Sequence, residues 1–253
     1  MRAFSRGHAA AVFLLSLICT PLHAAEINAA VAANFASPME RIAALFRKES
    51  GHTVKVSPGA SGKLYMQIKG GAPFDVFLSA DEEMPKHLLQ EGLAVAGSRF
   101  VYAGGRLVLW SLQPGLVDDK GAVLNSSKFE RLAYANPVFS PYGIAARETL
   151  TKLTMWNAMQ KKLKKAEDVT QAYQLAANEN ADLAFVALSQ VMRDGKVTTG
   201  SWWLVPPELH NPIRQSAVLL SGAKEPAAAQ ALLAFMKSEK AKAVMHGFGY
   251  ETP

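Results

Sequence analysis

The spacing of apolar residues over positions 26–80 predicts strand, helix, strand, helix and strand in turn. Residues 26–33 alternate as in a half-buried strand, and the helix that follows carries Met39, Ile42 and Phe46 on one apolar stripe. Residues 74–80 are almost continuously apolar, as in a strand buried on both faces of a parallel sheet. This order is typical of an α/β fold in which helices connect parallel strands.

A second series of strands and helices begins after residue 105. Its predicted strands are 106–112, 131–136 and 182–188, and its predicted helices lie near 142–153 and after Asp168. The chain then returns to the first series with a strand over 214–220 and one long helix from Pro226 onward. Glycines at 104 and 105 and the pair Pro206-Pro207 interrupt the pattern between the two series.

We therefore expect an α/β protein of two lobes, each a mostly parallel sheet flanked by helices, joined by a two-segment hinge. The first lobe would comprise residues 25–104 plus 213–253, and the second residues 105–212.

The first 24 residues are typical of a secretory signal peptide. Two arginines and no acid precede an apolar run over 10–19, which is too short to span a bilayer, and small residues follow at Ala24 and Ala25. We predict cleavage after Ala24 or Ala25 and a mature chain outside the cytoplasm.

Cys19, the lone cysteine of the 253 residues, lies in this leader. Acylation of Cys19 in a lipoprotein is the alternative, but the bulky Ile18 before it disfavours that processing. Cleavage downstream would leave no thiol for catalysis, a disulfide or zinc binding.

Composition and charge exclude several classes of protein. A hydrophobic content of 49% is too high for a disordered chain. Removal of residues 1–24 takes away two arginines and no acid, which lowers the formal charge from +6 to +4. This excess is too small for a nucleic-acid-binding surface, and we expect the densest basic run, 161–165, at a solvated helix end.

Known catalytic motifs are incomplete in this sequence. Gly59-Ala60-Ser61-Gly62 resembles part of a nucleophile elbow, but Lys63 follows where that motif needs glycine, and Leu64 stands where a phosphate loop needs Ser or Thr. The histidines of the mature chain are isolated and lack metal-ligand spacing. They are His52, His87, His210 and His246. We predict no enzyme, no cofactor and no resident metal; a secreted serine hydrolase using Ser61 is the distant alternative.

Four predicted helix entrances follow strands and carry candidate ligand-binding residues: Asn34, Ser61, Tyr142 and Val169. A helix N-terminus presents free N–H donors and about half a positive charge. Several such ends at one cleft can bind an anion without lysine or arginine. Ligands of open α/β sheets lie beyond the carboxyl ends of the strands, where these entrances are expected. The alternative is ordinary capping at each helix.

Longer motifs carry a resemblance to a known family. They include AVAANFASPM (30–39), PGASGKLYMQIKGGAPFDVFLSAD (58–81), ANPVFSPYGIAARETL (135–150), ENADLAFVALSQV (179–191) and GFGY (247–250). In these segments, which extend through most of the mature chain, the sequence resembles the molybdate-binding periplasmic proteins of ABC-type import systems.

The resemblance implies a two-lobed type II periplasmic-binding fold that closes over a tetrahedral dianion. Asn34 and Ser61 would bind the ligand from the first lobe, and Tyr142 and Val169 from the second, at least partly through backbone N–H groups. Metal would be present only as the molybdenum of bound molybdate. One version of the family pattern has Ser, Ala and Tyr where this chain has Asn34, Tyr142 and Ala187, whereas a second version shares the Asn and the Tyr.

The implied function is to capture molybdate in the periplasm and to deliver it to the membrane permease of an ABC importer. Tungstate, which is nearly the same size, is expected to bind as well, and the carrier is expected to be a monomer with no nucleic-acid partner. A carrier for sulfate or another tetrahedral oxyanion is the alternative.

Overall fold

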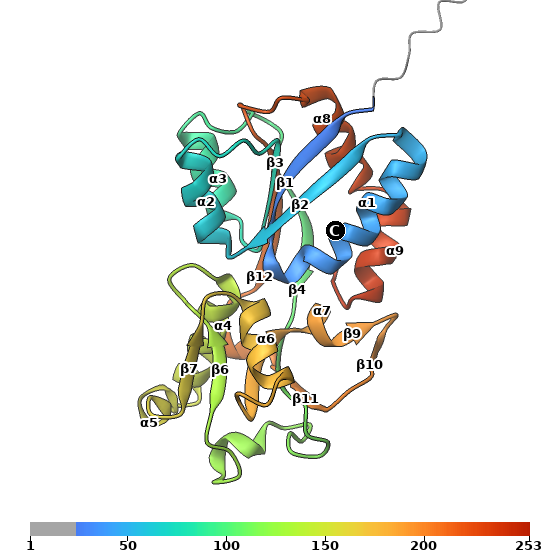
Figure 1. Cartoon of the computed structure of the whole chain (residues 1–253). Helices are drawn as coiled ribbons and strands as arrows, with labels where there is room; N and C mark the ends of the chain where they lie inside the picture. The colour runs from blue at the N-terminus through green and yellow to red at the C-terminus, as the bar shows by residue number, and fades with distance from the viewer. Residues whose placement is uncertain (1–23) are drawn as a thin grey trace, which may run out of the picture.

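The computed structural model describes residues 24–253, in which two five-stranded sheets are flanked by helices (Figure 1). This arrangement confirms the predicted α/β fold of two lobes. The predicted signal peptide, including Cys19, lies outside the described residues except for Ala24. Within the described part of the chain, no helix is both long and apolar enough to cross a membrane.

The first sheet takes most of its strands from the beginning of the chain and one from near its end. In spatial order they are β2 (Thr53–Gly59), β1 (Glu26–Ala32), β3 (Val76–Ser79), β12 (Ile213–Leu219) and β4 (Phe100–Gly105). β1, β2 and β3 run parallel, and β12 runs antiparallel to both of its neighbours. The sheet is therefore mostly parallel, as predicted, with β12 as its reversed strand.

Helices cover both faces of the first sheet (Figure 1). One face carries α1 (Ala36–Ser50), α8 (Pro226–Phe235) and α9 (Glu239–Gly247), and the other carries α2 (Ser61–Lys69) and α3 (Glu83–Gln90). Because side chains alternate along a strand, Ile27 and Val31 of β1 pack toward α1, whereas Ala30 packs toward α2.

The second sheet repeats this arrangement with strands from the middle of the chain. In spatial order they are β11 (Ser201–Leu204), β5 (Leu107–Ser111), β8 (Leu183–Ala187), β6 (Leu132–Ala135) and β7 (Leu163–Ala166). β6, β7 and β8 run parallel, and β5 is the reversed strand. Leu107 and Leu109 of β5 pack in the cluster that contains α4 (Pro141–Lys152), whereas Val108 packs with α6 (Val169–Ala177).

Shorter elements complete the described chain. They are the helices α5 (Trp156–Met159) and α7 (Leu188–Val191), the strands β9 (Met192–Arg193) and β10 (Lys196–Val197), and the 3-10 turns η1 (Ala33–Phe35), η2 (Ala122–Asn125) and η3 (Pro207–Leu209).

The two sheets are joined where β4 leads directly into β5 and where the chain returns into β12. At the first crossing, packing requires a glycine, because a Cβ on Gly105 would lie 2.3 Å from the hydroxyl oxygen of Tyr142. Glu251 exchanges two backbone hydrogen bonds with Gly104, so the C-terminal segment lies beside this crossing. We propose that the lobes divide at the two crossings, with 25–104 plus 213–253 on one side and 105–212 on the other.

Two sequence predictions about elements were wrong. The long helix predicted from Pro226 is two helices, because the Ser238 hydroxyl accepts a hydrogen bond from the Ala241 N–H at 3.3 Å and begins α9. The basic run 161–165 is predicted at a helix end, but only Lys161 and Lys162 lie in the turn after α5, whereas Lys164 and Lys165 are exposed on β7, an edge strand. Lysines suit such an edge because their charge discourages pairing with another chain.

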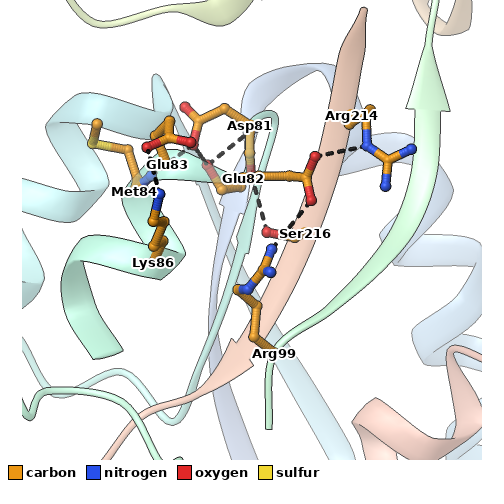
Figure 2. A network of polar contacts seen from close by, with 9 residues as sticks. Asp81, Glu82, Glu83, Met84, Lys86, Arg99, Arg214 and Ser216 are labelled. Atoms are coloured by element: carbon orange, nitrogen blue, oxygen red, sulfur yellow. Dashed lines mark hydrogen bonds and ion pairs between the residues drawn. The ribbon is translucent and has the colours of Figure 1, made fainter. Parts of the chain in front are cut away.

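A polar network connects β12 to the segment between β3 and α3 of the same lobe (Figure 2). The Glu82 carboxylate accepts hydrogen bonds from Arg214 of β12 at 2.6 Å and from Arg99 at 3.2 Å. The Ser216 hydroxyl donates to the backbone oxygen of Asp81 at 3.1 Å. Both neighbours of Gln215 are therefore held by the segment between β3 and α3, and this strand is expected to move with the first lobe.

We expect Glu82→Gln to destabilise the chain at neutral pH and to have little effect in acid. Burial alone would raise the pKa of Glu82, but hydrogen bonds from Arg214 and Arg99 outweigh it and hold the pKa below its ordinary value of 4.5. A lowered folded-state pKa gives stability that is fully present above the unfolded-state value and is lost as the pH falls through the folded-state value. Partly exposed ion pairs contribute about 1 kcal/mol, so Tm should fall by about 2–4 °C near pH 7.

Thermal unfolding followed by circular dichroism at about pH 7 and about pH 3 measures this difference. Glu83→Gln is the matched control, because Glu83 pairs only with Lys86 one helical turn away at 3.7 Å. An equal loss of Tm at both pH values for Glu82→Gln would contradict the role of its charge.

Candidate functional site

A small cavity lies between the two lobes, at the carboxyl ends of parallel strands of both sheets. Its volume is about 10 Å³, close to the lower limit for holding one water molecule. The lining residues come from the segments that follow β1, β2 and β3 and from those that precede α4 and α6. They are Ala32, Ala33, Asn34, Gly59, Ala60, Ser61, Ala80, Ser140, Pro141, Asp168 and Val169.

Three of the residues that line this cavity lie at or next to a helix N-terminus. Ser61 is the first residue of α2, Val169 is the first residue of α6, and Asn34 lies in the turn before α1. Among the backbone hydrogen bonds of residues 24–253 that lie outside helices and strands, none is donated by the N–H of these three residues, and the first N–H groups of a helix have no partner within it. Free N–H groups at the positive ends of helices stabilise an anion.

Ser61 is buried with 1% of its surface exposed. Its hydroxyl oxygen accepts a hydrogen bond from the Ala80 N–H at 2.9 Å, which leaves the hydroxyl proton available for donation to a ligand. The structure therefore places Ser61 in the cavity, and its backbone and side chain can both donate.

Asn34 lines the cavity, but its side-chain amide is already engaged. The Nδ2 group donates to Oε1 of Gln215 at 2.9 Å and to the hydroxyl oxygen of Tyr250 at 2.8 Å. The backbone oxygen of Asn34 accepts from the Ser189 hydroxyl at 2.9 Å. The backbone N–H is thus the donor that Asn34 can offer to a ligand, while its side chain fixes the turn.

Tyr142, the second residue of α4, is buried against Gly105 of the hinge and does not line the cavity. Its hydroxyl oxygen accepts a hydrogen bond from Nε2 of Gln215 at 3.3 Å. Burial raises the pKa of Tyr142 well above its usual range, so the phenol stays neutral. The structure brings Asn34, Ser61 and Val169 together around one cavity and places the Tyr142 side chain behind it.

Val169 is positioned by the cap of α6. The Asp168 carboxylate accepts a hydrogen bond from the Gln171 N–H at 2.9 Å, as the sequence predicted for a capping residue. The Thr170 hydroxyl donates to the backbone oxygen of Ala33 at 3.2 Å, which ties the start of α6 to the first lobe.

Sequence reasoning missed Ser140 and Gln215. Ser140 is buried, lines the cavity and makes no side-chain capping bond to α4, although a serine directly before Pro141 is a sequence signal for a helix start. Gln215 is fully buried within an apolar strand, and its polarity in that pattern was the only available signal.

Charged groups contribute little to the cavity itself. Asp168 is the charged side chain of its lining, and its carboxylate is engaged by α6. In residues 24–253, no three His, Cys, Asp or Glu side chains are grouped as a metal site requires. The arrangement can therefore hold an anion through N–H and hydroxyl donors alone.

Contacts across the lobe boundary surround the cavity. The Gly62 N–H donates to the backbone oxygen of Phe139 at 2.9 Å, and Lys63 pairs with Glu167 at 3.0 Å. These contacts join the start of α2 to the segments before α4 and α6, so the structure represents the lobes in contact.

Comparisons with known proteins agree with this geometry. A family model described as bacterial extracellular solute-binding protein matches residues 27–251. The molybdate-binding protein ModA of Azotobacter vinelandii is 49% identical over 98% of both chains, and that of Rhodobacter capsulatus is 48% identical over 98% of this chain and 96% of its own. The solved Azotobacter vinelandii periplasmic molybdate-binding protein matches with a TM-score of 0.88 and 41% identity, covering 90% of this chain and 99% of its own.

These matches confirm the resemblance found in the sequence motifs and the type II periplasmic-binding fold. They give the serine-hydrolase hypothesis no support, since the relatives are solute-binding proteins. The match over nearly the whole described chain shows that this protein belongs to the family of bacterial extracellular solute-binding proteins.

Proposed function

We propose that this protein captures molybdate between its two lobes and delivers it to the membrane permease of an ABC importer. The observation that carries the proposal is that Asn34, Ser61 and Val169, each at or next to a helix N-terminus, line one inter-lobe cavity, where the Ser61 hydroxyl keeps its proton for donation. The relatives named molybdate-binding proteins, at 49% and 48% identity, support the choice of ligand.

The chemistry of the donors favours a fully deprotonated oxyanion. N–H and hydroxyl donors satisfy oxygen lone pairs, but they offer few acceptors to a ligand that still carries a proton. A dianion removed from water needs a donor at essentially every oxygen, because an unpaired buried charge is prohibitively costly. Discrimination against sulfate must then depend on cavity size, and tungstate is expected to bind as well as molybdate does.

Ligand entry requires the lobes to separate. A cavity of about 10 Å³ is too small for a five-atom oxyanion in the arrangement described. Rotation about the two crossings would break the Gly62–Phe139 and Lys63–Glu167 contacts, and closure would bring the same segments together again around a cavity enlarged by the ligand. We propose binding and not catalysis, by a periplasmic monomer without a cofactor, whose closed form docks on the permease.

Isothermal titration calorimetry of residues 25–253 with molybdate, tungstate, sulfate and phosphate tests the proposed function. We expect one-to-one binding of molybdate and tungstate that sulfate does not displace. Preferred binding of sulfate or phosphate would keep the anion site but overturn the proposed ligand. No binding of any of these anions would contradict the carrier function.

We expect Ser61→Ala to weaken molybdate binding by roughly 10- to 150-fold. The substitution removes one hydrogen bond to a charged ligand, worth about 1.5–3 kcal/mol. Ser50→Ala is the matched control, because the Ser50 hydroxyl donates within α1 to the Phe46 oxygen at 2.8 Å, at the opposite end of that helix from the cavity. Calorimetry on both variants measures the change, and equal affinity in Ser61→Ala and wild type would show that the Ser61 hydroxyl does not bind the ligand.

Gly62→Ala is expected to weaken binding about tenfold or more, while the proposed open, ligand-free form stays at least as stable. A Cβ on Gly62 would lie 3.1 Å from Cα and 3.3 Å from the oxygen of Phe139, so full closure is obstructed by overpacking, which costs about 1–3 kcal/mol. The same alanine favours α2 by about 1 kcal/mol in the unliganded chain.

Stopped-flow release of molybdate and the Tm of the ligand-free protein measure the two effects of Gly62→Ala separately. Gly222→Ala is the control, because a Cβ there meets no atom within 4 Å. Unchanged affinity and release in Gly62→Ala would show that closure does not need this close approach.

A further inference from the structure

A buried cluster of hydrogen-bonded side chains lies behind the anion cavity, at the junction of both lobes and the hinge. Its members are Asn34, Tyr102, Tyr142, Ser189, Gln215 and Tyr250. All of them are buried, and no buried side-chain nitrogen or oxygen lacks a hydrogen-bond partner in the described part of the chain. Such a fully satisfied polar cluster restricts its members to one arrangement.

Gln215 is the member that contacts both Asn34 of the first lobe and Tyr142 of the second. Its exposed fraction is 0%. Its Oε1 accepts hydrogen bonds from Nδ2 of Asn34 and from the Tyr102 hydroxyl, both at 2.9 Å. Its Nε2 donates to the Tyr142 hydroxyl oxygen of the second lobe at 3.3 Å. One amide group thus connects Asn34, whose side-chain amide is engaged by protein acceptors, with Tyr142, which does not line the cavity.

The backbone around Gln215 is built to hold this side chain. The pairing of β12 with β4 shifts register between Gln215 and Ser216, and such a bulge redirects a side chain. A Cβ on Gly105 would lie 2.6 Å from Nε2 of Gln215, so the hinge glycine leaves the space that the amide occupies. Arg214 and Ser216 on either side are anchored to the segment after β3 (Figure 2).

We propose that Gln215 is a positioning residue for the oxyanion site, holding Asn34 of the first lobe and Tyr142 of the second in the relative orientation of the closed state. Because Asn34 and Tyr142 then present their backbones in fixed directions, the amide of Gln215 acts on a ligand that it does not touch. This role rests on the proposed oxyanion-binding function.

Gln215→Leu replaces the amide side chain with an apolar side chain of similar size. We expect its affinity for molybdate to fall at least about tenfold, which corresponds to loss of one or more buried hydrogen bonds. Ser111→Ala is the matched control: Ser111 is equally buried and donates to the Asp182 oxygen at 2.7 Å, within the second lobe and away from the cluster. The control should lose stability without losing affinity.

Gln215→Glu supplies a readout that a merely structural role would not change. A protonated carboxyl can accept from Asn34 and donate to Tyr142, as the amide does, whereas a carboxylate cannot donate and repels the dianion. Burial raises the pKa of such a carboxyl toward neutrality. We therefore expect affinity close to wild type at about pH 6 and at least about tenfold weaker binding at about pH 9.

The groups that face this position keep the pH experiment interpretable. Tyr102 and Tyr142 are buried and their pKa values lie well above the usual range, and burial raises the pKa of Tyr250 to about 12. The charge of Asp81 acts on Tyr102. Wild type carries the same four groups, so its own affinity over the same pH range is the reference.

Calorimetry with molybdate, together with the Tm of each ligand-free variant, decides the proposal. Unchanged affinity in folded Gln215→Leu, or a pH profile of Gln215→Glu that parallels wild type, would overturn it. If Gln215→Leu does not fold, Gln215→Glu alone decides, and its failure to fold or bind at about pH 6 would also overturn the proposal. Absence of molybdate binding by wild type would refute the proposed function itself and not the role of Gln215.

Discussion

A dianion can leave water only where fixed donors replace its hydration, and this constraint accounts for the arrangement of both lobes. Parallel strands direct the following helices so that their N-terminal N–H groups meet beyond the sheet edge. The first lobe supplies such groups at Asn34 and Ser61, and the second lobe supplies one at Val169. Neither sheet encloses the cavity alone, so the site depends on contact between the lobes.

The hinge and the site are physically continuous. The turn that carries Asn34 is bonded to Gln215 of the returning hinge strand, and Gln215 is bonded to Tyr142 at the start of α4. Gly105 of the other crossing packs against both Gln215 and Tyr142. Relative motion of the lobes would therefore act directly on Asn34, which lines the cavity, because the hinge strand is hydrogen-bonded to it.

The contrast between Asn34 and Ser61 shows how far sequence patterns reach. The sequence predicts both as ligand-binding residues because they lie at helix entrances after strands, and both line the cavity. The Ser61 hydroxyl remains available to the ligand because, within the protein, its oxygen accepts a hydrogen bond from the Ala80 N–H and its proton stays free to donate. The Asn34 amide cannot, because Gln215 and Tyr250 already accept both of its hydrogens from positions distant in sequence. No local pattern contains that information.

The sequence by itself determined the alternation of strands and helices, the two lobes and the helix entrances, because these follow from local periodicity, capping and turn chemistry. The predicted Asp168 cap is an example, formed between residues three positions apart. Only the tertiary structure decided which predicted residues line the cavity and which side chains remain available to a ligand. Tyr142 does not line the cavity, and the Asn34 amide is hydrogen-bonded to Gln215, 181 positions away in sequence. Such contacts depend on which strands become neighbours, and chain order does not specify this until the whole sheet has formed.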